Sequence, residues 1–113
     1  MSDWSKGQGV KSMPREPDSM DEVADLMREN LPAGMSPAEF GKRMNWGRGS
    51  AEAEARMPTI TIGELERIGL GAEQATNWAI AYEAVVRLMP DNPSAAGRAR
   101  LMRHAARLLA RGK

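Results

Sequence analysis

Apolar residues recur every three or four positions along most of the chain, which is the spacing of amphipathic helices. The first such segment begins at Ser19, a predicted helix N-cap, and stops at Pro32. In the second segment, Ser36 and Glu39 have the spacing of a capping box, and Pro37 takes the first helical position. Both segments therefore predict short helices that begin at a serine.

The same periodicity continues to the end of the chain. A short helix rich in Ala and Glu is expected to begin with Ser50 as its N-cap. Another is expected to run to about Ile68, with Thr61 and Glu64 in the spacing of a capping box. Longer helices are expected over residues 72–89 and 92–111. The first of these has one apolar stripe, formed by Ala75, Trp78, Tyr82, Val85, Val86 and Met89. Residues 59–62 alternate like a strand, but four residues without a partner predict an extended lead-in to a helix. The predicted fold is all-α, a compact bundle of five or six short helices.

Residues 1–18 lack this periodicity, because they are mostly polar and include Gly and Pro. Such a segment predicts a disordered tail or linker, with the helical domain following over residues 19–113. No signal peptide is recognisable, since the first thirty residues contain no apolar run. Nothing in the chain approaches the roughly 18 consecutive apolar residues of a membrane span, so no membrane insertion is expected.

The chain of 113 residues has three Trp, one Tyr and one Phe, so its core must rely on aliphatic residues and nine Met. Because Met side chains are flexible and specify packing poorly, moderate stability is expected. In such a chain Trp46, within the segment M-N-W-G-R-G-S, is expected in the core. Asn45 and Arg48 are then its exposed neighbours. If this loop binds a ligand, Arg48 and the backbone are the expected contacts.

Charge is unevenly distributed, although the net charge is only +1. Residues 1–40 carry eight acidic and four basic side chains, whereas residues 84–113 carry seven basic and one acidic. The two ends could pair with each other, or the basic end could form a surface for an anionic partner. Within the helix expected over 72–89, Glu83 and Arg87 have the spacing of an i,i+4 ion pair.

The last predicted helix carries most of the basic residues. Five of them gather on the face opposite its apolar side: Arg100, Arg103, His104, Arg107 and Arg111. A basic face of this kind can bind the phosphates of a nucleic acid, although it can equally be a solvated helix surface. The candidate anion-binding residues are Arg48, Arg100, Arg103 and Arg107.

Arg98 departs from this arrangement, because it lies near the middle of the apolar face of the same helix. Its guanidinium group must reach solvent, or meet a carboxylate or backbone carbonyl groups. The candidate carboxylate partners of Arg98 are Glu64, Glu66 and Asp91. Arg98 is therefore either a structural ion-pair residue or an anion-binding arginine.

Cysteine is absent and His104 is the single histidine, which excludes thiolate zinc sites, cysteine nucleophiles and histidine metal clusters. The spacing of Arg98 and His104 resembles the Arg–His motif of HEPN-type ribonucleases, which pair that motif across a dimer. Ala99 departs from that family, where a polar residue is common at this position. The candidate catalytic residues are Arg98, His104 and Tyr82. Whether the domain is an enzyme is left open, and neither a metal nor a cofactor is expected.

Three segments carry a further resemblance: W-G-R-G before an Ala-rich helix, G-L-G-A-E-Q-A-T-N-W-A-I-A-Y, and N-P-S-A-A-G-R-A-R-L-M. They resemble a small uncharacterised domain found at the C-terminal ends of bacterial proteins of the polymorphic-toxin type, delivered by Rhs-like or type VI secretion carriers. The resemblance extends from about Met35 to Leu109.

This resemblance implies a secreted effector domain that acts in a target cell, with nucleic acid as one candidate target of the basic last helix. The alternative is a non-enzymatic helical adaptor or protein–protein interaction module of a secretion system. The implied partners are an immunity protein or a secretion carrier. The expected location is outside the producing cell, by a carrier-dependent route without its own signal peptide, or the cytoplasm.

Overall fold

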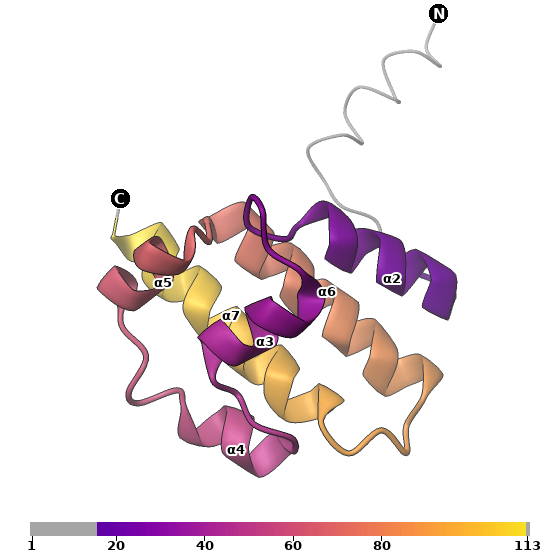
Figure 1. Cartoon of the computed structure of the whole chain (residues 1–113). Coiled ribbons are helices and arrows are strands. Elements are labelled where there is room, and N and C mark those ends of the chain that lie inside the picture. The colour runs from indigo at the N-terminus through magenta and orange to yellow at the C-terminus, as the bar shows by residue number, and fades with distance from the viewer. Residues whose placement is uncertain (1–15, 113) are drawn as a thin grey trace, which may run out of the picture.

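The computed structural model describes residues 16–112, and every regular element within that range is a helix (Figure 1). The all-α prediction is confirmed. Residues 59–62 form no strand, but the predicted extended lead-in is shorter than expected, because Thr59 lies in a turn and Ile62 already begins a helix. Most of the tail predicted over residues 1–18 lies outside the described residues. In chain order the helices are α2 (Met20–Glu29), α3 (Pro37–Met44), α4 (Ser50–Ala55), α5 (Ile62–Ile68), α6 (Ala72–Leu88) and α7 (Ala95–Arg111).

Three of the predicted helix starts are confirmed at the level of single hydrogen bonds. Each capping hydroxyl accepts a bond from the backbone N–H three residues further on, which satisfies one of the free donors of the first turn. The distance from the backbone nitrogen to the hydroxyl oxygen is 3.1–3.2 Å in all three cases. The N–H of Glu22 donates to Ser19, that of Glu39 to Ser36 and that of Glu64 to Thr61. These starts are therefore fixed by residues close together in the sequence.

The predicted role of Ser50 is wrong, because Ser50 is the first residue of α4 and Gly49 takes the cap position. The Ser50 hydroxyl instead donates to the carbonyl oxygen of Pro93 at 3.0 Å and accepts from the N–H of Gly97 at 2.9 Å. The Glu52 carboxylate accepts from the free N–H of Gly49 at 2.7 Å. Ser50 thus ties the start of α4 to the start of α7.

α7 is the helix around which the others gather. It packs along α6, and α4 and α5 also contact it, whereas α2 lies against α6 (Figure 1). The contact between α4 and α7 is unusually close at Gly97. A Cβ atom built there would lie 2.3 Å from the carbonyl oxygen of Ser50 and 2.4 Å from its Cα. Only glycine permits this approach of the two backbones.

The core has two parts, a main cluster around α7 and a smaller one where α2 meets α6. The smaller cluster surrounds Val23 of α2 with alanines of α6. Val86 and Met89 were predicted on the buried stripe of α6, but their side chains are 39% and 47% exposed. Instead α6 turns small residues inward, including Ala79 and Ala81. The prediction failed because large side chains were assumed to mark the buried side.

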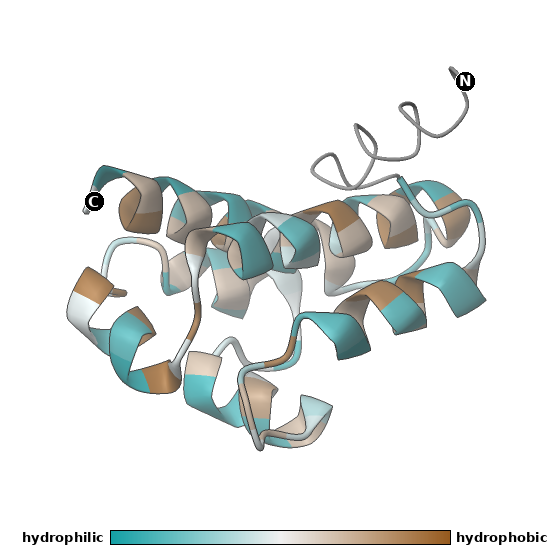
Figure 2. Ribbon diagram, turned by 90° about the horizontal axis from the view of Figure 1, so that it is seen from above, coloured by the Kyte–Doolittle hydropathy of each residue, from teal (hydrophilic) through white to brown (hydrophobic). Residues whose placement is uncertain are grey.

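The helices of the described part carry both hydrophobic and hydrophilic residues (Figure 2). Within residues 16–112, none is long and apolar enough to cross a membrane. Contacts with the helical domain begin before Ser19, since Pro17 is buried and its carbonyl oxygen accepts a hydrogen bond from Arg87 at 3.0 Å.

Candidate functional site

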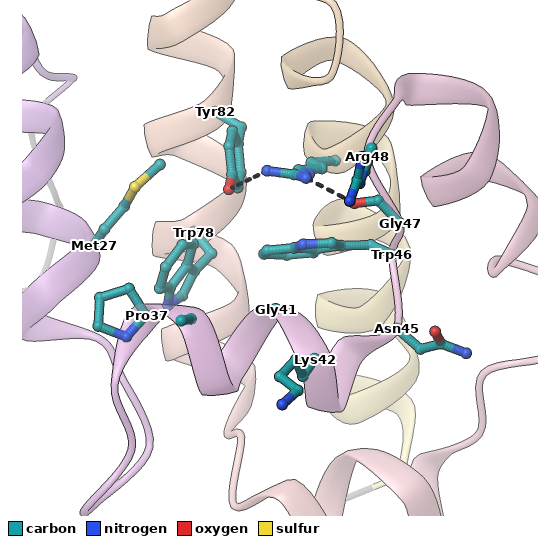
Figure 3. A pocket seen from close by; sticks show the side chains of 12 residues that line it. Met27, Pro37, Gly41, Lys42, Asn45, Trp46, Gly47, Arg48, Trp78 and Tyr82 are labelled. Carbon is teal, nitrogen blue, oxygen red and sulfur yellow. Dashed lines mark hydrogen bonds between the residues drawn. The ribbon is translucent and has the colours of Figure 1, made fainter.

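A cleft of about 760 Å³ lies between α3, the loop that follows it, and the facing sides of α6 and α7 (Figure 3). We call it the Trp46 cleft. Trp46, Trp78, Tyr82 and Arg98 form its inner part, and Lys42 of α3 also lines it. Met27 of α2 completes the lining, so the cleft joins residues from four helices.

The inner part of the cleft belongs to an aromatic cluster. This cluster contains four of the five aromatic residues of the chain, namely Trp46, Trp78 and Tyr82, which line the cleft, and Phe40, which is buried behind them. The rings of Trp46 and Tyr82 meet edge to face, with centroids 5.6 Å apart, and those of Phe40 and Trp78 lie 4.6 Å apart. Trp46 is only 6% exposed, so its predicted place in the core is confirmed.

The backbone after α3 turns Trp46 back onto that helix. Asn45 ends α3 in the left-handed conformation, with φ of 55°, and its N–H donates to the carbonyl oxygens of Gly41 and Lys42. Gly41 leaves the space that the indole needs, because a Cβ atom there would lie 3.0 Å from Nε1 of Trp46. The sequence G-K-R-M-N-W therefore places the indole at the inner wall of the cleft.

Arg98 faces the same wall from α7. Its guanidinium carbon lies 4.8 Å from the ring centroid of Trp46 and 5.8 Å from that of Tyr82. Nη2 donates to the carbonyl oxygen of Gly47 at 2.8 Å, and Nη1 makes a longer contact of 3.4 Å with the Tyr82 hydroxyl oxygen. Nε is buried without a hydrogen-bond partner among the described residues.

The inward orientation of Arg98 was predicted, but its predicted carboxylate partners are wrong. Neither Glu64, Glu66 nor Asp91 pairs with it, and Glu64 instead pairs with Arg56 at 2.6 Å. Within residues 16–112, no carboxylate forms an ion pair with Arg98. The ring faces of Trp46 and Tyr82 and the carbonyl oxygen of Gly47 stabilise its positive charge. A backbone carbonyl was one of the predicted alternatives, whereas the ring faces were not.

Tyr82 and Trp46 offer polar hydrogens in the same cleft. Burial raises the pKa of the Tyr82 phenol above its usual value, while the contact with Arg98 acts in the opposite direction. The phenol is therefore protonated at neutral pH. Because its oxygen accepts from Arg98, its hydrogen is available to a ligand, and it donates to no residue in the described part of the chain. The Trp46 indole N–H likewise has no acceptor among residues 16–112.

Arg48 lines the cleft and is exposed, as predicted for this loop, and Asn45 is exposed too. Lys42 is an exposed residue that sequence reasoning missed, since nothing in its local pattern indicates that it lines a cleft. No ion pair within residues 16–112 involves either Lys42 or Arg48. The cleft therefore carries three cationic side chains and no carboxylate or histidine in its lining.

The other predicted anion-binding residues lie away from this cleft. Arg103 makes two hydrogen bonds to the carboxylate of Glu83, at 2.7 and 2.8 Å, and Glu83 raises the pKa of Arg103. Arg100 pairs with Glu54 of α4. The basic face is thus partly neutralised by acidic residues from the middle of the chain. Arg107 is exposed and pairs with no carboxylate in the described part.

The pairing of Arg103 explains why the predicted i,i+4 ion pair on α6 is absent. Glu83 is taken by Arg103 of α7, and Arg87 contacts Glu16 at 3.7 Å. Contacts of α6 with α7 and with the segment before α2 therefore replace the predicted ion pair within α6.

The structure brings together two of the three candidate catalytic residues. Arg98 and Tyr82 meet in the Trp46 cleft, whereas His104 does not line it. Arg98 and His104 are six positions apart on α7, which separates them by roughly 120° around the helix. The spacing that resembles the HEPN motif therefore does not converge on this cleft within one chain. Among the described residues, no group of three or more His, Cys, Asp or Glu side chains could hold a metal ion.

The fold and the cleft define an all-helical domain with a basic, aromatic recess. Residues 15–109 match the family described as "Domain of unknown function (DUF4951)", and the chain belongs to this family. No curated protein and no solved structure matches the chain. The description of the family names neither a toxin nor a secretion system, and it attaches no activity to the fold.

Proposed function

We propose that the domain is a non-enzymatic recognition module that binds an anionic group of a ligand or partner in the Trp46 cleft. The observation that carries the proposal is the state of Arg98, a partly buried guanidinium that pairs with no carboxylate among residues 16–112. A cation removed from water is stabilised most by a nearby negative charge. An oxyanion in the cleft would supply that charge.

The polar groups of the cleft favour the same ligand chemistry. Arg98, Tyr82 and Trp46 offer hydrogens, and these are the groups that bind a carboxylate or phosphate oxygen. The faces of Trp46 and Trp78 are largely covered, since both rings are nearly buried, so stacking of a flat ligand on them is disfavoured. The ligand is therefore expected to meet ring edges, the hydroxyl and the guanidinium.

The composition of the lining favours binding over catalysis. A general acid or base is most often a histidine or a carboxylate within hydrogen-bond reach of the reacting group. Neither type lines the cleft, and the raised pKa of Tyr82 makes it a poor base at neutral pH. An interaction module is therefore better supported than an enzyme.

Titration of the full chain with inorganic phosphate, and separately with acetate, tests this proposal. The readout is the chemical shift of the Trp46 indole N–H. We expect it to move in a saturable manner, with a Kd at least threefold weaker in Arg48→Gln and in Tyr82→Phe. Arg43→Gln is the matched control, because Arg43 is exposed on α3 but does not line the cleft. A Trp46 signal that does not move, or equal losses in the control, would contradict the proposal.

A toxin-type effector remains the second candidate function. It is supported by the resemblance to polymorphic-toxin domains and by the meeting of Arg98 with Tyr82 in one cleft. In this proposal the domain leaves the producing cell by a carrier, and an immunity protein binds it. Expression in bacterial cytoplasm tests it, because the unaltered chain should arrest growth and Arg98→Gln or His104→Ala should relieve the arrest. A harmless unaltered chain would remove this candidate.

A further inference from the structure

A second depression, of about 470 Å³, lies on the other side of α7, between α6 and α7. We call it the α7 groove. Met57, Val86, Ala96 and Ala99 supply its apolar part, and arginines of α7 supply its basic part. Arg98 and Arg107 are nine positions apart, which places them about half a turn from each other around the helix. The groove is therefore separate from the Trp46 cleft.

The shape of the α7 groove suits a helix. Its α7 lining extends from Ala96 to Arg107, which corresponds to about 16 Å along a helix axis, or three turns. Ala96 and Ala99 are one turn apart and have small side chains, so another helix can approach α7 closely between them. Val86 is 39% exposed beside them and offers an apolar contact to a bound helix.

The charges of the groove favour an acidic occupant. Its lining contains three arginines, at 100, 103 and 107, and one carboxylate, Glu83. Arg107 forms no ion pair within residues 16–112. Arg100 is bound to Glu54 only through an exposed pair, and such pairs contribute about 0–1 kcal/mol. Arg100 can therefore exchange this partner for another carboxylate at little cost.

We propose that the α7 groove binds an acidic amphipathic helix of a partner protein. The carboxylates of that helix would meet Arg107 and Arg100, and its apolar side chains would pack on Val86 and Ala96. A nucleic acid matches the charge but has no apolar face for Val86. A second copy of this chain would bring like charges together at the groove, and its acidic helix α2 already packs its apolar side on α6. The inference does not depend on ligand binding in the Trp46 cleft.

Selection of a displayed library of random 14-residue peptides on the full chain tests the proposal. We expect the enriched peptides to be rich in Glu and Asp and to carry apolar residues at i, i+3, i+4 and i+7. The binding of the enriched peptides should be at least tenfold weaker to Arg107→Glu and to Val86→Asp. Arg67→Glu is the matched control, because Arg67 is an exposed arginine of α5 that does not line the groove, and it should bind as the unaltered chain does.

Three outcomes would overturn the inference. The first is a selection that enriches no peptide, and the second is one whose peptides are not acidic or bind Arg107→Glu unchanged. The third is stronger binding to a random-sequence 20-nucleotide DNA than to the enriched peptides, lost in Arg107→Glu and steeply dependent on salt. That result would identify the groove as a nucleic-acid surface. Circular dichroism of each variant confirms that a loss of binding is not a loss of fold.

Discussion

Arg98 and Arg103 lie five positions apart on α7, but their guanidinium groups have different kinds of partner. Arg103 reaches the half-buried carboxylate of Glu83 through two hydrogen bonds, whereas Arg98 lies over an indole with a backbone carbonyl as its best acceptor. Their local sequences, G-R-A-R and M-R-H-A, do not distinguish them. The difference comes from what faces each side of α7. The inner side of α7 carries Gly97 and Arg98, which meet α4 and the Trp46 loop together with Tyr82. The outer side carries Arg103, which meets the carboxylate of Glu83 on α6.

The strongest way to disturb the inner side is to add one methyl group at Gly97. Gly97→Ala should destabilise the fold by about 3 kcal/mol, because its Cβ would overlap backbone atoms of Ser50 that cannot rotate away. The shift of Ser50 should also loosen its bond to Pro93. Chemical denaturation of the purified chain measures the change in the free energy of unfolding.

The same substitution at Gly63 is the control for helix propensity. Gly63 lies inside α5, and the nearest atom to its added Cβ is the end of the Arg67 side chain, 3.6 Å away. Gly63→Ala should stabilise the chain by up to about 1 kcal/mol. If Gly97→Ala were also stabilising, the close contact between α4 and α7 would be wrong.

Removal of Arg98 should have the next largest effect. Arg98→Ala should destabilise the fold by about 2 kcal/mol, since it deletes the bond to Gly47 and the contact over Trp46. Arg98→Lys should recover only a minor part of the lost stability, because an ammonium group cannot lie flat on the Trp46 ring and also make the bond to Gly47. Denaturation midpoints of the two variants measure this, and an Arg98→Lys variant as stable as the unaltered chain would contradict the geometry.

The ionisation of Tyr82 tests the inner side of α7 through the pH dependence of the free energy of unfolding. Its pKa is raised in the folded state, so the fold holds the phenol proton more tightly than the unfolded chain does. This contribution is fully present below about pH 10, the usual pKa of tyrosine, and is lost as the pH rises through the folded-state pKa. Unfolding curves between pH 8 and 11.5 should show stability falling more steeply in the unaltered chain than in Tyr82→Phe. One proton limits the difference in slope to about 1.4 kcal/mol per pH unit.

Substitution of Arg103, on the outer side of α7, should change the free energy of unfolding least. Arg103→Ala should destabilise the fold by less than about 1 kcal/mol, because Arg103 and Glu83 are each 40% exposed and their attraction is screened by solvent. Moderate salt should reduce this effect further. A loss as large as that of Arg98→Ala would show that the two sides of α7 do not differ as proposed.

Features encoded by neighbouring residues were predictable from the sequence. The caps at Ser19, Ser36 and Thr61 depend on a donor three residues away, and the hydrophobic period defined the helices. Trp46 was placed correctly in the core, because a chain with five aromatic residues has few other aromatic rings to bury.

Features that depend on distant contacts were not predictable. Ser50 looks like a cap, but its hydroxyl bonds to residues more than forty positions away. The same reason applies to Arg98, whose partners Gly47 and Tyr82 become neighbours only when the helices pack. In the candidate site, the sequence identified Arg48, Tyr82 and Arg98 one at a time. It contained no sign that they share a cleft.

The aromatic cluster also makes this domain a reporter of its own folding. The indole rings of Trp46 and Trp78 lie 6.2 Å apart and are inclined by 56°, in fixed orientations beside Tyr82. Aromatic rings held rigidly in an asymmetric environment give a near-ultraviolet circular dichroism signal, which disappears when packing becomes fluid even if the helices persist. Optical measurements without any added label can therefore distinguish a properly packed chain from a merely helical one.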